Sequence, residues 1–488
     1  MEDKAVRGVS WTTLSYAVNR GIRTVSTIAL ARLLSPEDFG LVALAAVTLG
    51  LINVLTDLGL GGVLVIRPDL GARGRGTVLT MMVGTGALGA GIVVVASPLA
   101  ADALGDPRVT PVLAVLSATL VINVFAWFYQ TLLQRELEFR RIFICNVVST
   151  VVYVGVVIPL AVMGAGPWSL VTAELCGGLA LGAALLSLAP IRIRPAFDPH
   201  AAREVLSEGW GFLVQGGLGA VSDNADRLVV GRALGVASLG FYTMAYRLGD
   251  LPYQAFGHPV ATVLFPGLAR MNERGEDVGS SFLGALRLVA LVSCPVGVIL
   301  SATAYPFTAL VFGEKWLPMV GILTAFGIWA ALRPLLFTTG WLLNALGRAR
   351  LLASITGSML LPFIAGAILA AAYGGVAQVA WVAVASSLAT AVILGYFASR
   401  STGMSPRRYW RALRTVVIAC ALCWIAAAVV ADVTAPAGLA TSLAASVSSG
   451  LIAYLLVVYL LEPRLLQGLP ALVRRALGRA PAAAGGPV

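Results

Sequence analysis

Residues 222–250 read SDNADRLVVGRALGVASLGFYTMAYRLGD, and several Asp and Arg residues interrupt the apolar sequence there. The chain around this stretch is 58% hydrophobic and only 12% charged, whereas soluble globular proteins carry roughly 25% charged residues. A protein core does not need this much apolar sequence, so we expect a lipid bilayer to be the solvent of the chain. Charges placed there are expensive, and we expect them to line a water-filled path through a membrane protein.

Long apolar segments fill the rest of the chain, and a membrane-spanning helix needs about 20 mostly apolar residues. The sequence therefore predicts an all-α membrane protein with about fourteen spans, joined by short links that are rich in Gly and Pro. The predicted spans are 9–31, 39–61, 78–98, 109–133, 142–163, 167–189, 208–231, 237–265, 281–305, 317–343, 351–372, 376–398, 412–431 and 438–461.

The basic residues indicate the orientation of these spans. With the N-terminus in the cytoplasm, 23 of the 34 Lys and Arg residues fall in cytoplasmic segments and 4 in outer loops, as the positive-inside rule requires. This distribution accounts for the net charge of +11 without a nucleic-acid partner. We expect both termini in the cytoplasm, a retained first helix rather than a signal peptide, and a basic tail at 464–488.

A weak internal repeat appears at an offset of 200 residues. ARLLSPEDFGLVALA at 31–45 aligns with GRALGVASLGFYTMA at 231–245, and four positions recur: Arg32, Leu34, Gly40 and Ala45 as Arg232, Leu234, Gly240 and Ala245. Both stretches join the first and second helix of a half. We therefore expect six-helix bundles at 1–199 and 200–400 and two additional helices at 401–463. Parallel repeats are a transporter design, with the substrate site between the halves.

Several motifs with possible chemistry are better explained as ordinary helix sequence. GTGALG at 84–89 fits a dinucleotide-binding pattern, but it lies inside an apolar run where small residues allow close helix packing. Cys420 and Cys423 form a CxxC without a second pair, and His200 and His258 cannot complete a zinc site. No P-loop or nucleophile triad is present, so we expect a transporter with no cofactor, metal or catalytic residue.

Five arginines inside predicted spans are the strongest candidates for substrate binding: Arg20, Arg23, Arg227, Arg247 and Arg333. Arg20 and Arg23 are three residues apart and point from one helix face. Each central Arg costs about 2.5–3.5 kcal/mol if it faces lipid, so these side chains must face an interior. An excess of guanidinium groups there favours an anionic ligand such as a phosphate.

Acidic residues accompany these arginines and are expected to be ion-coupling sites or structural partners: Asp57, Glu174, Asp223, Asp226 and Asp250. Asp223 and Arg227 are spaced i, i+4, and Arg247 and Asp250 are spaced i, i+3, so each pair can interact along one helix. An alternative explanation for all these charges is that they tie helices together, or that they lie near the interface and extend to water.

Two stretches carry a family resemblance: RGVSWTTLSYAVNRGIRTVSTIALARLLSPEDFGLVALA at 7–45 and GFYTMAYRLGDLPYQAFGHPVATVLFP at 240–266. They resemble bacterial polysaccharide flippases of the multidrug/oligosaccharidyl-lipid/polysaccharide superfamily, in the branch of colanic-acid and teichuronic-acid exporters. The resemblance implies two six-helix bundles related by a pseudo-twofold axis, a V-shaped central cavity and two further helices. It also implies cationic cavity residues on the first, seventh and eighth helices, which Arg20, Arg23, Arg227 and Arg247 match by position.

The activity that the resemblance implies is alternating-access transfer of an undecaprenyl-pyrophosphate-linked oligosaccharide across the cytoplasmic membrane, in company with membrane lipids and a polysaccharide polymerase. One alternative is a multidrug antiporter of the same superfamily, which would prefer an acidic or aromatic cavity. A polymerase or ligase would need a large external loop, whereas every predicted outer loop has about a dozen residues or fewer. A membrane scaffold would have no use for arginines inside its spans.

Overall fold

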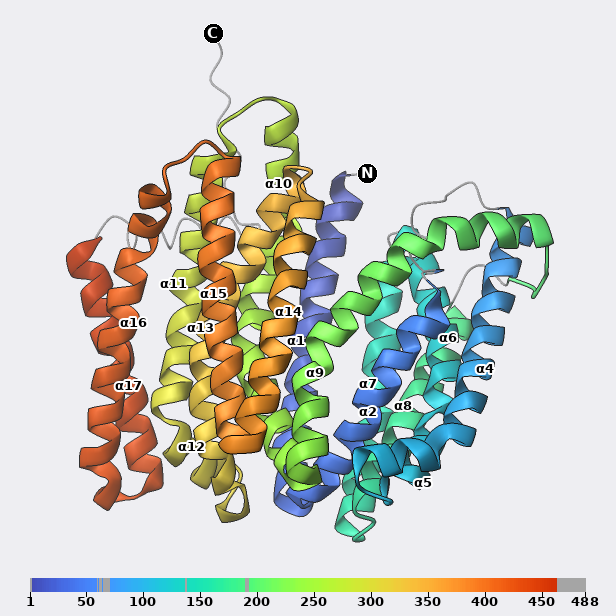
Figure 1. Ribbon diagram of the computed structural model, residues 1–488, viewed down its shortest axis with the longest axis horizontal. Helices are drawn as coiled ribbons and strands as arrows, with labels where there is room; N and C mark the ends of the chain where they lie inside the picture. Colours follow the sequence, from blue (N-terminus) through green and yellow to red (C-terminus); the bar gives the residue numbers. More distant parts are fainter. Residues whose placement is uncertain are drawn as a thin grey trace. The chain divides into compact units, whose positions relative to one another are not determined.

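The computed structural model describes residues 2–58, 60, 64, 71–136, 138–188 and 193–462, and this part of the chain is helical with no strand (Figure 1). The predicted all-α class is confirmed. The helices of the first half are α1 Glu2–Leu33, α2 Pro36–Asp57, α4 Ala72–Leu104, α5 Val109–Leu116, α6 Ala118–Arg135, α7 Phe139–Val162 and α8 Pro167–Leu188.

The second half of the chain begins with a long helical run. Its elements are α9 Pro199–Pro252, η1 Tyr253–Gly257, α10 His258–Glu273, α11 Val278–Ala302, α12 Ala304–Val311, η2 Glu314–Met319, α13 Val320–Ala345, α14 Ala349–Tyr373, α15 Val376–Ser401, α16 Pro406–Thr434, η3 Ala435–Ala437 and α17 Leu439–Leu461.

Twelve helices in the described part are long and apolar enough to cross a membrane, so the predicted count of fourteen is not confirmed. Helix α1 is not among the twelve, and it carries Arg20 and Arg23 in its middle. The predicted spans 208–231 and 237–265 both reach into α9, which contributes one candidate, Gly216–Ala255. Gly235, with φ 84°, breaks α9 into two helical segments, because glycine adopts positive φ without steric cost.

The chain forms two compact units. The first unit comprises Met1–Ala245, Val311–Met319 and Leu360–Val382, and the second comprises Tyr246–Leu310, Val320–Met359 and Ala383–Val488. In the first unit α7 packs against α1 and α8, and α6 packs against α4 and α8 (Figure 1). The C-terminal tail predicted at 464–488 lies outside the described residues.

The link LSPEDFG in the first unit starts α2 sharply. The Ser35 hydroxyl accepts from the Asp38 backbone N–H at 3.2 Å, and the Asp38 carboxylate accepts from the Ser35 backbone N–H at 2.8 Å. This reciprocal capping box satisfies two helix-end donors, and Pro36 at the first helical position lacks a donor that would need a partner. The start of α2 is therefore determined locally by its own sequence.

The two stretches of the predicted repeat, 31–45 and 231–245, contact each other within the first unit. A Cβ added to Gly40 would overlap the Val236 carbonyl oxygen and lie 3.1 Å from the Gly240 nitrogen. A Cβ added to Gly240 would overlap the Pro36 carbonyl oxygen and lie 3.2 Å from the Gly40 nitrogen. Two equivalent helix starts thus cross backbone to backbone, which is possible because neither glycine has a side chain.

The repeated arginines also take reciprocal positions in the first unit. Arg32 donates from Nε to the Val311 carbonyl at 2.8 Å, and its Nη1 lies 2.9 Å from the place of a Cβ on Gly313. Arg232 Nη1 lies 3.7 Å from the place of a Cβ on Gly105. Both glycines have positive φ, 91° and 82°, and each follows the end of a helix. Each arginine of the repeat therefore lies against a glycine turn of the other half.

Segment Val311–Met319 also caps the end of α1 within the first unit. Lys315 Nζ donates to the carbonyls of Arg32 and Leu34 at 2.9 and 2.7 Å, and the buried Trp316 indole donates to the Ala31 carbonyl at 2.8 Å. These bonds satisfy carbonyl groups that have no partner within a helix end. They join residues nearly 300 positions apart in the chain.

An exposed ion cluster marks the loop that follows Gly105. Arg108 bonds the Asp106 carboxylate at 2.8 Å and reaches Glu37, at the start of α2, at 3.0 Å. The hydrogen bond from Arg108 holds the pKa of Asp106 below its usual value. Because the cluster faces water, we assign it little stability.

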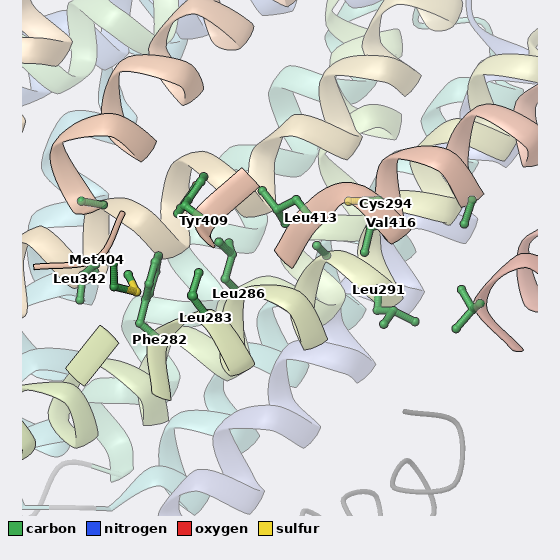
Figure 2. Packing of buried hydrophobic residues seen from close by; sticks show 14 of the residues in the cluster. Phe282, Leu283, Leu286, Leu291, Cys294, Leu342, Met404, Tyr409, Leu413 and Val416 are labelled. Carbon is green, nitrogen blue, oxygen red and sulfur yellow. The ribbon is translucent and has the colours of Figure 1, made fainter. Parts of the chain in front are cut away.

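The second unit has an apolar core between α11, α13, α16 and α17, and Figure 2 shows part of it. Phe282 and Leu286 of α11 are fully buried, as is Tyr409 of α16 at 1% exposure. Within this core the Tyr454 hydroxyl donates to the Leu291 carbonyl at 2.8 Å. Helices α16 and α17 thus pack against α11.

The reciprocal glycine contact can be tested by adding single methyl groups. We expect Gly40→Ala and Gly240→Ala each to destabilise the protein by about 1–3 kcal/mol, because the added Cβ meets backbone atoms that cannot move independently. The measurement is thermal unfolding of the purified protein. Gly50→Ala, on α2 with nothing within 4 Å of the new Cβ, is the matched control and should melt at or slightly above the wild-type temperature. A wild-type melting temperature for Gly40→Ala would contradict the contact.

Candidate functional site

The two arginines of α1 lie in different surroundings in the first unit. The Arg23 guanidinium lies 5.0 Å from the centre of the Tyr153 ring of α7, a cation–π contact. Asn19, one turn earlier, accepts a hydrogen bond from Thr150 of α7 at 2.7 Å. Together these contacts fix the rotation of α1 against α7.

Arg20 is the candidate with the least compensation for its charge. Its side chain is half-buried, its Nε has no hydrogen-bond partner, and no described carboxylate forms an ion pair with it. A half-buried guanidinium without a counter-charge is costly, and it has its donors available for an anion.

Asp226 has a different role, because it joins the two segments of α9. Its buried carboxylate accepts from the Tyr242 hydroxyl at 2.6 Å, and from the backbone N–H of Arg227 at 2.8 Å. Tyr242 lies beyond the break at Gly235, so this bond closes the turn between the segments. Arg227 is half-buried and donates to the Asn224 side chain at 3.2 Å. The structure thus places Asp226 in a structural bond.

The second unit encloses Arg333 of α13 in a cage. Its Nη2 lies 2.6 Å from the Asp250 carboxylate, and the two side chains are only 13% and 9% exposed. The guanidinium also lies over three aromatic rings, 4.3 Å from the centre of Trp329, 4.5 Å from Phe337 and 5.2 Å from Tyr253. The Gln254 amide donates to the other oxygen of the same carboxylate. We call this group the Arg333 cage.

The other predicted charges are exposed or lie where no side chain is described. Arg247 is exposed on the last part of α9, in the second unit. Glu174 of α8 and Asp223 of α9 are exposed in the first unit. The side chain of Asp57, at the end of α2, lies outside the described residues. In the described part no group of His, Cys, Asp and Glu could hold a metal ion.

Sequence reasoning missed the partners of Arg333. It considered Asp250 beside Arg247, three residues away on the same helix, whereas the ion pair of Asp250 is with a residue 83 positions later. One signal was available: Trp329, Arg333 and Phe337 are spaced by four residues, so they share a face of α13. The carboxylate and Tyr253 come from another helix, and their approach depends on tertiary packing.

The chain is similar in sequence to known proteins. A family model described as polysaccharide biosynthesis protein matches residues 29–321. The lipopolysaccharide biosynthesis protein WzxC of Escherichia coli (strain K12) is 25% identical over 355 residues, 71% of each chain. The teichuronic acid biosynthesis protein TuaB of Bacillus subtilis (strain 168) is 26% identical over 377 residues, 77% of this chain and 78% of the relative.

The fold is also found among solved structures. A lipid II flippase, MurJ, in an inward closed conformation superposes with a TM-score of 0.74, covering 92% of this chain and 99% of that chain at 14% identity. At this identity the likeness concerns the fold alone. It agrees with the two-bundle membrane fold inferred from the sequence.

The Arg333 cage can be tested for a structural role. Arg333→Ala should cost about 3–5 kcal/mol, because it leaves the Asp250 carboxylate buried without its partner. The double variant D250A/R333A should be less destabilised than R333A, since neither charge remains unpaired.

The measurement is the unfolding midpoint of the purified variants. Arg274→Ala is the control: its side chain is 72% exposed and 3.8 Å from Glu276, so its loss should change stability by less than about 0.5 kcal/mol. Equal stability of R333A and the wild type would show that the ion pair contributes nothing to the fold.

Proposed function

This chain belongs to the family of polysaccharide biosynthesis proteins, and on that premise we propose that it is a flippase for a lipid-linked oligosaccharide. The cargo is a polysaccharide repeat unit on undecaprenyl pyrophosphate, carried from the inner to the outer leaflet of the cytoplasmic membrane. The observation that carries the proposal is the family match over 29–321, which extends from α1 into η2 and α13.

The many apolar helices make this a multi-pass membrane protein, and the resemblance inferred from 7–45 and 240–266 is confirmed by the family match and the relatives. It is a transporter rather than an enzyme. We propose the cytoplasmic side for both termini, because the basic residues favour it. A polysaccharide polymerase is the proposed downstream partner.

Arginines support the choice of a pyrophosphate-bearing cargo. We propose that Arg20, Arg23, Arg227 and Arg247 attract the pyrophosphate, because guanidinium groups bind phosphate oxygens in pairs. The unpaired Nε of half-buried Arg20 supports this role most directly. For Arg333 we propose a supporting part, since its charge is already neutralised by Asp250.

The acidic residues divide in the same way. We propose that Asp226 and Asp250 serve structural pairing, because each accepts bonds from buried partners. Exposed Glu174 and Asp223 are the candidates that we propose for ion coupling, together with Asp57.

The domain division is also a proposal. We propose six-helix bundles at 1–199 and 200–400, two additional helices at 401–463 and a basic tail at 464–488. The recurrence of a glycine and an arginine at an offset of 200 supports equivalent halves. Opposing tilts of these halves would expose a central V-shaped cavity to each side of the membrane in turn, while the polyprenyl chain stays in lipid.

Deletion of the gene tests the proposed function directly. We expect lipid-linked oligosaccharide to accumulate on the cytoplasmic leaflet, because synthesis continues while transfer stops. The measurement is extraction and leaflet-selective labelling of lipid-linked glycans, with restoration by the wild-type gene as the control. Unchanged glycan lipids together with increased drug sensitivity would instead support the antiporter alternative.

Charge reversal tests the proposed arginines. Arg20→Glu and Arg247→Glu should each abolish export while the protein stays in the membrane, since a carboxylate repels the pyrophosphate. The measurement is surface polysaccharide with the variant protein quantified in membranes. Arg274→Glu, outside the spans, provides a matched reversal and should export normally. Normal export by both R20E and R247E would remove these arginines from the site.

A further inference from the structure

The first unit contains a cavity of about 420 Å³ between α2, α4, α6, α8 and α9. Sites for small molecules occupy roughly 300–1,000 Å³, so this volume suits a ligand of modest size. The cavity belongs to the first unit, whereas the Arg333 cage belongs to the second. None of the arginines discussed above lines the cavity.

The described lining of the cavity is mostly apolar, with a few polar side chains and no charged one. Asn53, Thr56, Asn123 and Gln130 contribute amides and a hydroxyl, Trp127 contributes an indole, and the other lining residues are apolar or glycine. None of the described lining residues can neutralise a phosphate. The cavity is therefore suited to a neutral ligand that has both hydroxyl groups and an apolar face.

The amide groups around the cavity are available for a ligand. The side-chain amides of Asn53, Asn123 and Gln130 form no hydrogen bond with a residue that the structure describes, although each lies in a helix long and apolar enough to span a membrane. Polar side chains in such helices usually bond across to a neighbouring helix, as Asn19 does with Thr150. Because these three do not, and all three line the cavity, their amides are open to a ligand bound there.

Helix α6 is built to present these groups together. Asn123, Trp127 and Gln130 are spaced i, i+4 and i+7 and so share one face of the helix. The adjacent Phe128 and Tyr129 are buried at 0% and 5% exposure in the core of the unit, whereas Trp127 is 45% exposed. One side of α6 thus packs in the core of the unit. Its other side carries the exposed Trp127 indole and the amides of Asn123 and Gln130.

The lining residues also lie near the helix ends on one side of the first unit. Asn53, Gln130 and Leu181 lie within the last two turns of α2, α6 and α8, while Met82 and Leu213 lie a few turns after the starts of α4 and α9. All of these helix ends belong to the side for which the basic residues favour a cytoplasmic location. The cavity is therefore nearer to the side from which the cargo is supplied.

We propose that this cavity is a subsite for one neutral sugar residue of the cargo, and this inference rests on the proposed function. The C–H face of a pyranose ring would lie on Trp127, since indole offers an apolar face at low conformational cost. The amides of Asn53, Asn123 and Gln130 would bond its hydroxyls, because an amide both donates and accepts, as a hydroxyl does. The arginines hold the anionic end of the cargo, and this cavity selects its sugar.

The test measures sugar binding to the purified full-length protein in lipid nanodiscs. Saturation-transfer NMR with methyl β-D-glucopyranoside as the neutral probe should show binding, whereas glucuronate, which is anionic, should bind at least tenfold more weakly. Trp127→Ala and Asn123→Leu should each weaken the binding of the neutral probe by roughly tenfold or more, which corresponds to about 1.4 kcal/mol. Trp127→Phe keeps an aromatic face and should retain part of the binding.

The chain offers matched controls for both variants. Trp381→Ala on α15 removes an indole of nearly equal exposure, 43%, and Asn344→Leu on α13 removes an exposed amide outside the cavity. Both should bind the neutral probe as the wild type does, and all variants should share its melting temperature. Binding by W127A and N123L at wild-type strength, or no binding by the wild type, would overturn the subsite.

A second arm separates this proposal from the proposed function. Undecaprenyl pyrophosphate without sugar should bind W127A and the wild type equally, because the cavity does not contact the anionic group. If the wild type binds the neutral probe through the cavity but gene deletion leaves glycan lipids unchanged, the subsite stands and the flippase function falls. If deletion causes accumulation but the cavity variants bind normally, only the subsite falls.

Discussion

The contact on which the fold depends is the backbone crossing of Gly40 and Gly240. At this crossing two equivalent helix starts approach so closely that a single methyl group on either would overlap a carbonyl oxygen of the other. The two repeated arginines extend the same reciprocity outward, each toward a glycine turn of the other half. If the two helices moved apart at this crossing, side chains could not fill the gap without a change in the path of both helices. The close backbone contact therefore has no looser alternative.

The apolar surroundings of the chain make the compensation of each charged side chain important. In a bilayer an unpaired charge is expensive, and the described structure deals with this cost in two ways. Asp226 and Asp250 bind buried hydroxyl, amide and guanidinium groups, so their charges stabilise helix contacts. Arg20 has no such compensation, and its cost has a purpose if an anionic cargo supplies the missing charge.

The proposed cargo has two chemically different ends, and the chain has two kinds of site. Guanidinium groups suit the pyrophosphate, whereas the uncharged cavity around Trp127 suits a sugar ring. Separating these functions has a physical advantage. A neutral cavity with amides can discriminate between sugars by the position of hydroxyl groups, whereas a strong charge in the same cavity would hold any phosphate equally well.

Local sequence was sufficient to predict the class of the protein, most of its apolar helices, the repeat and the family. These features depend on local composition, on hydropathy over about 20 residues, and on motifs that are contiguous in the chain. The capping box at Ser35 is local in the same sense, because donor and acceptor are three residues apart. Tertiary packing was needed to show that Arg333 pairs with Asp250, that Tyr242 closes the break at Gly235, and that Asn53 and Asn123 line one cavity. Those pairings join different helices, and their geometry depends on the rotation of each helix about its axis, which hydropathy does not specify.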